Sequence, residues 1–112
     1  MLVKSKKEVF EVAVRDTIIG KFRGLMFSKK PKNDGLLFFF KKESVVSLHM
    51  FFVFFSIDVV YVNKEKKIVE IKRKVKPFYP FILGPPAKYI LELKDARSLE
   101  VGEKLIVNEH KP

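Results

Sequence analysis

Two ionisable residues, His49 and Asp58, interrupt the most apolar stretch of this sequence and have the clearest chemical potential. The stretch runs from Leu48 to Val62 and otherwise holds apolar residues, a tyrosine and a serine. An ionisable side chain is expensive to bury alone, so each must be paired, hydrogen-bonded or functional. If a bend brings the two together, they could form an acid–base or ligand-binding pair. The structural alternative is a hydrogen-bonded core histidine and an aspartate that caps a turn or neutralises a cation, for which Arg23 is the candidate.

The amino-acid composition excludes most other kinds of catalytic and metal-binding site. Cysteine is absent, which excludes disulfides, cysteine-ligated zinc and thiol nucleophiles. His49 and His110 are the only histidines, so a three-histidine metal site is impossible and we expect no metal or cofactor. A nearby serine could complete a triad with His49 and Asp58, but none lies in a nucleophile elbow. The sequence therefore favours a binding or accessory domain over an enzyme.

The elements that position these residues are mostly strands. The run 48–62 is too long for one strand and, with its acid, too short for a membrane helix, so it should bend near Phe55 and continue as a strand over 57–62. Further strands are expected over 8–15, 36–40, 68–75, 88–93 and 104–107, with a hairpin loop at 63–67. Asp16 is a good N-cap for a short helix over 17–23 that ends at Gly24, and a single helical turn is expected over 95–99.

The segment 77–86 is rich in proline and aromatic residues and cannot continue a strand ladder. It should cover an apolar surface, either as a lid over a ligand pocket or as plain packing at one end of a barrel. With several short strands, one helix and no repeat or linker, residues 1–112 predict a single domain of the β-rich α+β class. We expect a small, mixed, β-barrel-like fold with one short helix near the N-terminus.

The formal charge is +10, from 23 basic and 13 acidic residues, and such a surplus attracts polyanions. The densest basic segment contains Lys64, Lys66, Lys67, Lys72, Arg73, Lys74 and Lys76. These side chains could face nucleic-acid phosphates, or they could protect an exposed strand edge from pairing with another chain. Lysine dominates while glutamine and tryptophan are absent, which is typical of hyperthermophile proteins. The charged start lacks the apolar stretch of a signal peptide, so we expect a cytoplasmic protein without membrane association.

Five ordered motifs resemble one known family. They are Arg23-Gly24-Leu25-Met26-Phe27, Gly35-Leu36-Leu37-Phe38-Phe39-Phe40, Met50 with Ile57-Asp58-Val59-Val60-Tyr61, Tyr89-Ile90-Leu91-Glu92-Leu93, and Gly102-Glu103. Together, over most of the chain, they resemble the domain of unknown function 192 family. The resemblance implies a small β-rich domain and no established activity. The family's Trp-Met-Lys-Asn-Thr segment stands here as His-Met-Phe-Phe-Val at 49–53, so a polar site built on those residues does not carry over.

Three functional interpretations remain open. The leading one is a binding or accessory domain with a small-ligand cleft near Arg23, His49 and Asp58, partly covered by Phe78 and Tyr79. The second is a nucleic-acid-binding module that holds phosphates with the basic residues between 64 and 76. The third is a hydrolase-like enzyme working through His49 and Asp58. Exposed phenylalanines could also form a homodimer interface.

Overall fold

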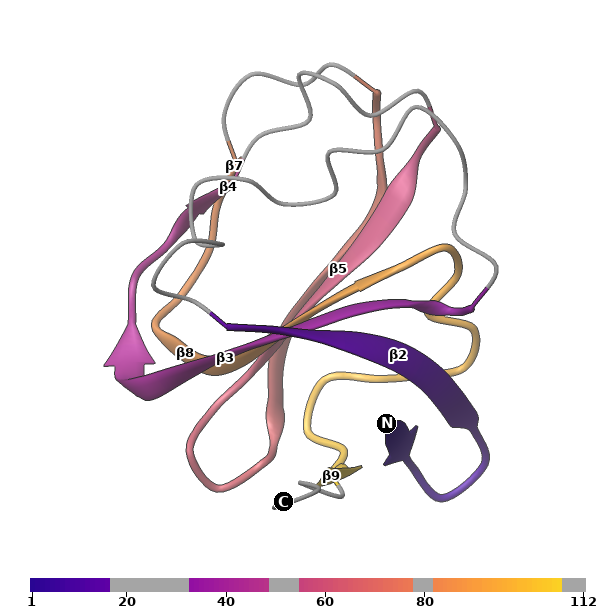
Figure 1. Ribbon diagram of the computed structural model, residues 1–112, viewed down its shortest axis with the longest axis horizontal. Helices are drawn as coiled ribbons and strands as arrows, with labels where there is room; N and C mark the ends of the chain where they lie inside the picture. The colour runs from indigo at the N-terminus through magenta and orange to yellow at the C-terminus, as the bar shows by residue number, and fades with distance from the viewer. Residues whose placement is uncertain (17–32, 49–54, 78–81, 108–112) are drawn as a thin grey trace.

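A computed structural model describes residues 1–16, 33–48, 55–77 and 82–107, and these residues form nine strands. The strands are β1 (Leu2–Lys4), β2 (Val9–Asp16), β3 (Gly35–Ser44), β4 (Ser47–Leu48), β5 (Ile57–Val62), β6 (Ile68–Val75), β7 (Ile82–Leu83), β8 (Ala87–Leu93) and β9 (Ile106–Val107). Seven of them form one sheet in the order β6-β5-β8-β3-β2-β1-β9, and β4 pairs with β7 separately. The large sheet curls into a half-barrel (Figure 1). Because β2 and β3 are parallel and the other paired strands antiparallel, the sheet is mixed, as the sequence predicts.

The segment 102–107 connects the two edges of the curled sheet. Next to β6, the N–H of Gly102 donates to the carbonyl of Ile68 at 2.8 Å, and the N–H of Leu105 donates to the carbonyl of Lys66 at 2.8 Å. The chain then enters β9, which pairs with β1 so that Val107 lies opposite Val3. These bonds link the terminal strand β6 to β1 through the segment that contains β9, the other terminal strand, and satisfy backbone groups that an open sheet would expose.

The sheet is buried on both faces, and each face has its own apolar core. All six residues of β5 are buried, and because side chains alternate along a strand, they divide between the two cores. One core, which we call the Tyr61 face, consists of Leu36, Phe38, Phe40, Val46, Phe55, Ile57, Val59, Tyr61, Ile82, Ala87 and Ile90. The other, the Phe10 face, includes Val3, Phe10, Val12, Leu37, Val60, Val62, Leu91, Leu93, Ala96, Leu99 and Leu105. The apolar runs of the sequence therefore become the interior of the domain.

Most of the strands expected from the sequence are confirmed. The predicted strands 57–62 and 68–75 coincide with β5 and β6. The hairpin between them is held by Asn63, whose side-chain oxygen accepts the N–H groups of Glu65 at 3.0 Å and Lys67 at 2.9 Å. The strands expected over 8–15, 36–40, 88–93 and 104–107 correspond to β2, β3, β8 and β9 with shifted ends.

Neither of the two predicted helical segments is confirmed. No helix occurs in the described parts of the chain, and the predicted helix over 17–23 lies outside them. The helical turn predicted over 95–99 is wrong: Leu99 N–H donates to the carbonyl of Ala96 at 3.1 Å, which closes a single β-turn. Arg97 has a φ of 53°, and one left-handed residue prevents a right-handed helical turn.

Two short strands also differ from the prediction. Within the proline-rich segment 77–86, the residues of β7 pair with β4, so part of this segment does join a ladder. The three-residue strand β1 is too short to show a periodic pattern in the sequence. No helix long and apolar enough to cross a membrane is found within the described ranges.

Candidate functional site

Asp58 is buried in β5, with 5% of its surface exposed. Its Oδ1 accepts the backbone N–H of Lys74 at 2.7 Å, and its Oδ2 accepts the backbone N–H of Ala96 at 2.7 Å. The Nη1 of Arg73 lies 3.7 Å from Oδ2, while Nη2 of the same guanidinium donates to the carbonyl of Leu99 at 2.7 Å. One carboxylate therefore connects β5 to β6 and to the turn that follows β8.

A bulge in β6 creates this arrangement. Two residues of β6, Arg73 and Lys74, lie opposite the single residue Asp58. Lys74 has a φ of 54°, and this left-handed conformation accompanies the turn of its N–H toward the carboxylate. Because both oxygens already accept charge-assisted hydrogen bonds from the backbone, a proton-transfer role would have to disrupt contacts that hold the fold. The geometry thus favours the structural alternative for Asp58.

The other residues of the predicted cleft lie outside the described residues. These are Arg23, His49, Phe78 and Tyr79. The cation that the structure places beside Asp58 is Arg73, which the sequence analysis assigned to the basic segment. The cleft and the pairing of Asp58 with Arg23 therefore stay predictions.

Glu92 is a second buried acid, and the sequence reasoning missed it as a site residue. It is 2% exposed and lies in β8, between Leu36 of β3 and Val59 of β5. Both neighbours belong to the Tyr61 face, so the Glu92 side chain lies on that face. The signal that marks Asp58, an acid within an apolar strand, marks Glu92 as well.

Tyr61 lies on the same face and is completely buried. Its hydroxyl has no hydrogen-bond partner among the described residues. Burial, followed by the charges of Glu70 and Glu92, raises the pKa of this hydroxyl, so it stays protonated and can donate a hydrogen bond. Gly84 covers the ring closely, since a Cβ at this position would lie 2.2 Å from the Cζ of Tyr61.

The Tyr61 face thus combines a phenol and a carboxylate within an apolar core. At its edge, Lys72 and Glu70 form an ion pair with an N–O distance of 2.8 Å. Within the described ranges, histidine and acidic side chains form no group of three that could hold a metal ion. Such a face can orient a small polar ligand through hydrogen bonds.

The basic residues predicted to bind nucleic acid fall into two groups, one at each end of β6. Lys64, Lys66 and Lys67 lie in the hairpin before this strand, whereas Lys72, Arg73, Lys74 and Lys76 lie along its later half and beyond it. Two of the latter group are engaged, Lys72 with Glu70 and Arg73 with Asp58. In the large sheet β6 is the terminal strand, a position in which lysines and a bulge discourage pairing with another chain.

Comparison with known proteins identifies the family. The sequence profile of DUF192, described as "Uncharacterized ACR", matches residues 1–106. A UPF0127 protein of Pyrococcus furiosus is 36% identical over 110 residues, which are 93% of this chain and 92% of that protein. A UPF0127 protein of Thermococcus sibiricus is 32% identical over 113 residues, which are 94% of this chain and 72% of that protein.

Two solved structures share the fold. A protein of unknown function from Novosphingobium aromaticivorans matches with a TM-score of 0.81 at 17% identity, covering 95% of this chain and 82% of that chain. A putative transcription regulator from Sinorhizobium meliloti matches with a TM-score of 0.72 at 18% identity, covering 94% and 89%. At such identities these structures show the fold alone. The family profile and the thermophilic archaeal relatives confirm both the resemblance of the motifs and the thermophile-like composition, and the chain belongs to the uncharacterised DUF192 family.

Proposed function

We propose that the chain is a small, non-catalytic binding domain whose ligand site lies on the Tyr61 face of the sheet. The observation that carries the proposal is a completely buried Tyr61 hydroxyl that has no hydrogen-bond partner among the described residues. Burying a hydroxyl without a partner is unfavourable, so such groups usually have a water, an ion or a ligand to satisfy them. A few polar groups in an otherwise apolar surface are the usual composition of a small-molecule site.

The chemistry of this face suggests the class of ligand. The raised pKa of Tyr61 keeps its hydroxyl a donor, so the ligand needs an acceptor atom. The carboxylates of Glu70 and Glu92 lie near enough to contribute to that raised pKa, and they would repel an anion. The surrounding side chains, such as Phe38 and Ile82, suit an apolar body. We therefore infer a small, uncharged or cationic ligand.

This proposal differs from the cleft expected at Asp58. Asp58 alternates with Ile57 and Val59, so its carboxylate lies on the opposite face, where Ala96 is its neighbour. Both of its oxygens are engaged, which gives no support to the hydrolase-like alternative. Arg23, His49, Phe78 and Tyr79 stay candidates for the binding site, and a cytoplasmic location stays part of the proposal.

The test removes the Tyr61 hydroxyl alone. Native mass spectrometry of the purified chain, and ligand-observed NMR with uncharged and cationic fragments, should detect binding to the wild type and weaker or no binding to Tyr61→Phe. Tyr89→Phe is the matched control, because Tyr89 is 5% exposed and belongs to the Phe10 face. Tyr61→Phe should change the free energy of unfolding by less than about 1 kcal/mol, since the hydroxyl makes no described hydrogen bond to lose.

Two results would refute the proposal. One is a wild type that carries no bound small molecule and binds no fragment. The other is binding that Tyr61→Phe and Tyr89→Phe leave equally unchanged, because the ligand would then not use the Tyr61 hydroxyl.

A further inference from the structure

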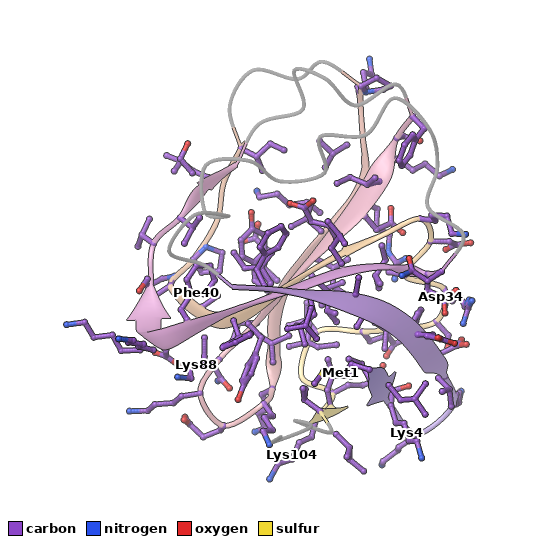
Figure 2. The ribbon with its side chains drawn as sticks, in the orientation of Figure 1. Met1, Lys4, Asp34, Phe40, Lys88 and Lys104 are labelled. Atoms are coloured by element: carbon purple, nitrogen blue, oxygen red, sulfur yellow. The ribbon has the colours of Figure 1, made fainter. Side chains whose placement is uncertain are left out.

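Seven lysines from four separate segments lie at one end of the half-barrel. We call this surface the lysine end: Lys41 and Lys42 from β3, Lys64, Lys66 and Lys67 from the β5–β6 hairpin, Lys88 from β8, and Lys104. Hydrogen bonds and backbone pairing join these segments. The carboxylate of Glu43 accepts the N–H of Lys64 at 2.7 Å, and the Nζ of Lys88 donates to the carbonyl of Lys41 at 2.7 Å. Lys67 and Lys104 form an isolated β-bridge. In Figure 2, Lys88 and Lys104 lie toward the lower left and the bottom, on either side of the hairpin.

The charges of the lysine end are not neutralised by the described residues. None of its seven lysines forms an ion pair there. Five of the seven are exposed, and Lys66 and Lys88 are half-buried. By contrast, Lys72, Arg73 and Arg97 on other surfaces each contact a carboxylate. Three glutamates stand directly next to these lysines in the sequence, Glu43, Glu65 and Glu103, which leaves a local surplus of four positive charges.

We propose that the lysine end binds the phosphate backbone of duplex nucleic acid without reading its base sequence. Lysine serves as a point charge for phosphates, whereas base recognition usually relies on the bidentate arginine fork, and the lysine end has no arginine. Single-strand binders add several stacking aromatic side chains to a basic groove. Phe39, which lies in β3 two residues before Lys41 and is 39% exposed, is the only aromatic among the exposed large hydrophobic residues described, so the lysine end offers one such side chain and not several. This surface therefore fits a duplex backbone better than splayed bases.

The site is independent of the proposed ligand site, and one assay tests it. Fluorescence anisotropy would measure the affinity of the whole chain for labelled DNA and RNA duplexes of about two helical turns, at salt concentrations between about 50 and 200 mM. Counterion release predicts a linear fall of log K with log salt, with a slope near −0.9 for each phosphate contacted. AT-rich and GC-rich duplexes should bind equally well.

Three variants with two substitutions each show which surface of the chain binds the duplex. Lys64→Gln/Lys67→Gln removes two lysine-end charges, and Lys74→Gln/Lys76→Gln removes the same charge at the far end of β6, where both residues are exposed. The first should reduce the salt slope by about 2 and weaken binding roughly tenfold or more, while the second should have little effect. Lys42→Gln/Lys104→Gln should match the first variant, although neither residue belongs to the basic segment 64–76. All these side chains are exposed, so circular dichroism should show folded variants.

Three outcomes would overturn the proposal: no duplex binding at the lowest salt, equal losses in the Lys64/Lys67 and Lys74/Lys76 variants, or tighter binding to the single strand than to its duplex. Equal losses would mean diffuse attraction by the net charge. Tyr61→Phe should bind duplexes as the wild type does, so failure here is distinguishable from failure of the proposed ligand site.

Discussion

Replacing Asp58 by alanine should strongly destabilise the fold without exposing any new surface. The carboxylate accepts the backbone N–H groups of Lys74 and Ala96, each at 2.7 Å, and both donors would lose their partner. Ala96 is completely buried, so its N–H cannot turn to water instead. A buried donor without a partner destabilises the fold by the full free-energy cost of its desolvation. This cost is larger than the net stabilisation that one hydrogen bond gives.

The magnitude follows from counting these contacts. Hydrogen bonds to a charged group contribute about 1.5–3 kcal/mol each, so two give about 3–6 kcal/mol. The ion pair with Arg73 adds little, about 0–1 kcal/mol, because the Arg73 side chain is 44% exposed and the N–O distance is 3.7 Å. We therefore expect Asp58→Ala to lower the free energy of unfolding by about 3–6 kcal/mol, out of a typical total of about 5–15 kcal/mol.

Guanidinium titration followed by circular dichroism would measure this loss, with Arg73→Gln as the comparison. Arg73→Gln should lose no more than about 1–2 kcal/mol, since it removes a partly solvated ion pair and one hydrogen bond to Leu99. Asp58→Asn should recover only part of the alanine loss, because its amide nitrogen must face one of the two N–H donors. The reasoning fails if Asp58→Ala costs less than about 1 kcal/mol, or if Arg73→Gln costs as much as Asp58→Ala.

Two further predictions concern close packing and pH. Gly84→Ala should lower the free energy of unfolding by about 1–3 kcal/mol, because the new Cβ would lie 2.2 Å from the Cζ of Tyr61; a denaturant titration with wild-type stability would contradict this. The hydroxyl and the N–H of Ser98 lower the pKa of Glu8, so the stabilisation by Glu8 is complete above its ordinary pKa and is lost as the pH falls through the lowered value. Ser98→Ala should therefore raise the Glu8 pKa toward 4.5 in an NMR titration, and an unchanged pKa would refute the assignment.

The β5–β6 hairpin shows what local sequence can predict. Alternating and apolar residues marked both strands, and the polar run from Asn63 to Lys67 marked the loop, because these signals come from neighbours along the chain. The turn over 95–99 shows the limit. Its sequence is compatible with a helical turn, but the left-handed Arg97 contacts Asp34 and Val9, which are distant in sequence. Long-range contacts thus override a weak local preference.

The candidate sites were harder to predict than the strands. Asp58 stood out as a buried acid, yet its donors, Lys74 and Ala96, belong to segments that no spacing rule connects to it. Glu92 and Tyr61 share a face only because of the register between β5 and β8, in which Tyr61 lies opposite Ile90 and Val59 opposite Glu92. If the register between β5 and β8 shifted by one residue, the side chains of Tyr61 and Glu92 would lie on opposite faces of the sheet.

By itself, the sequence determined that the domain is rich in strands, that it has no thiol chemistry, and that its motifs are those of DUF192. These properties depend on residue types and on patterns within short segments. Only the tertiary structure decided which face each buried polar side chain occupies and which lysines gather at one end of the half-barrel. The reason is that strand order and register join residues far apart in the chain, and local propensities do not specify either.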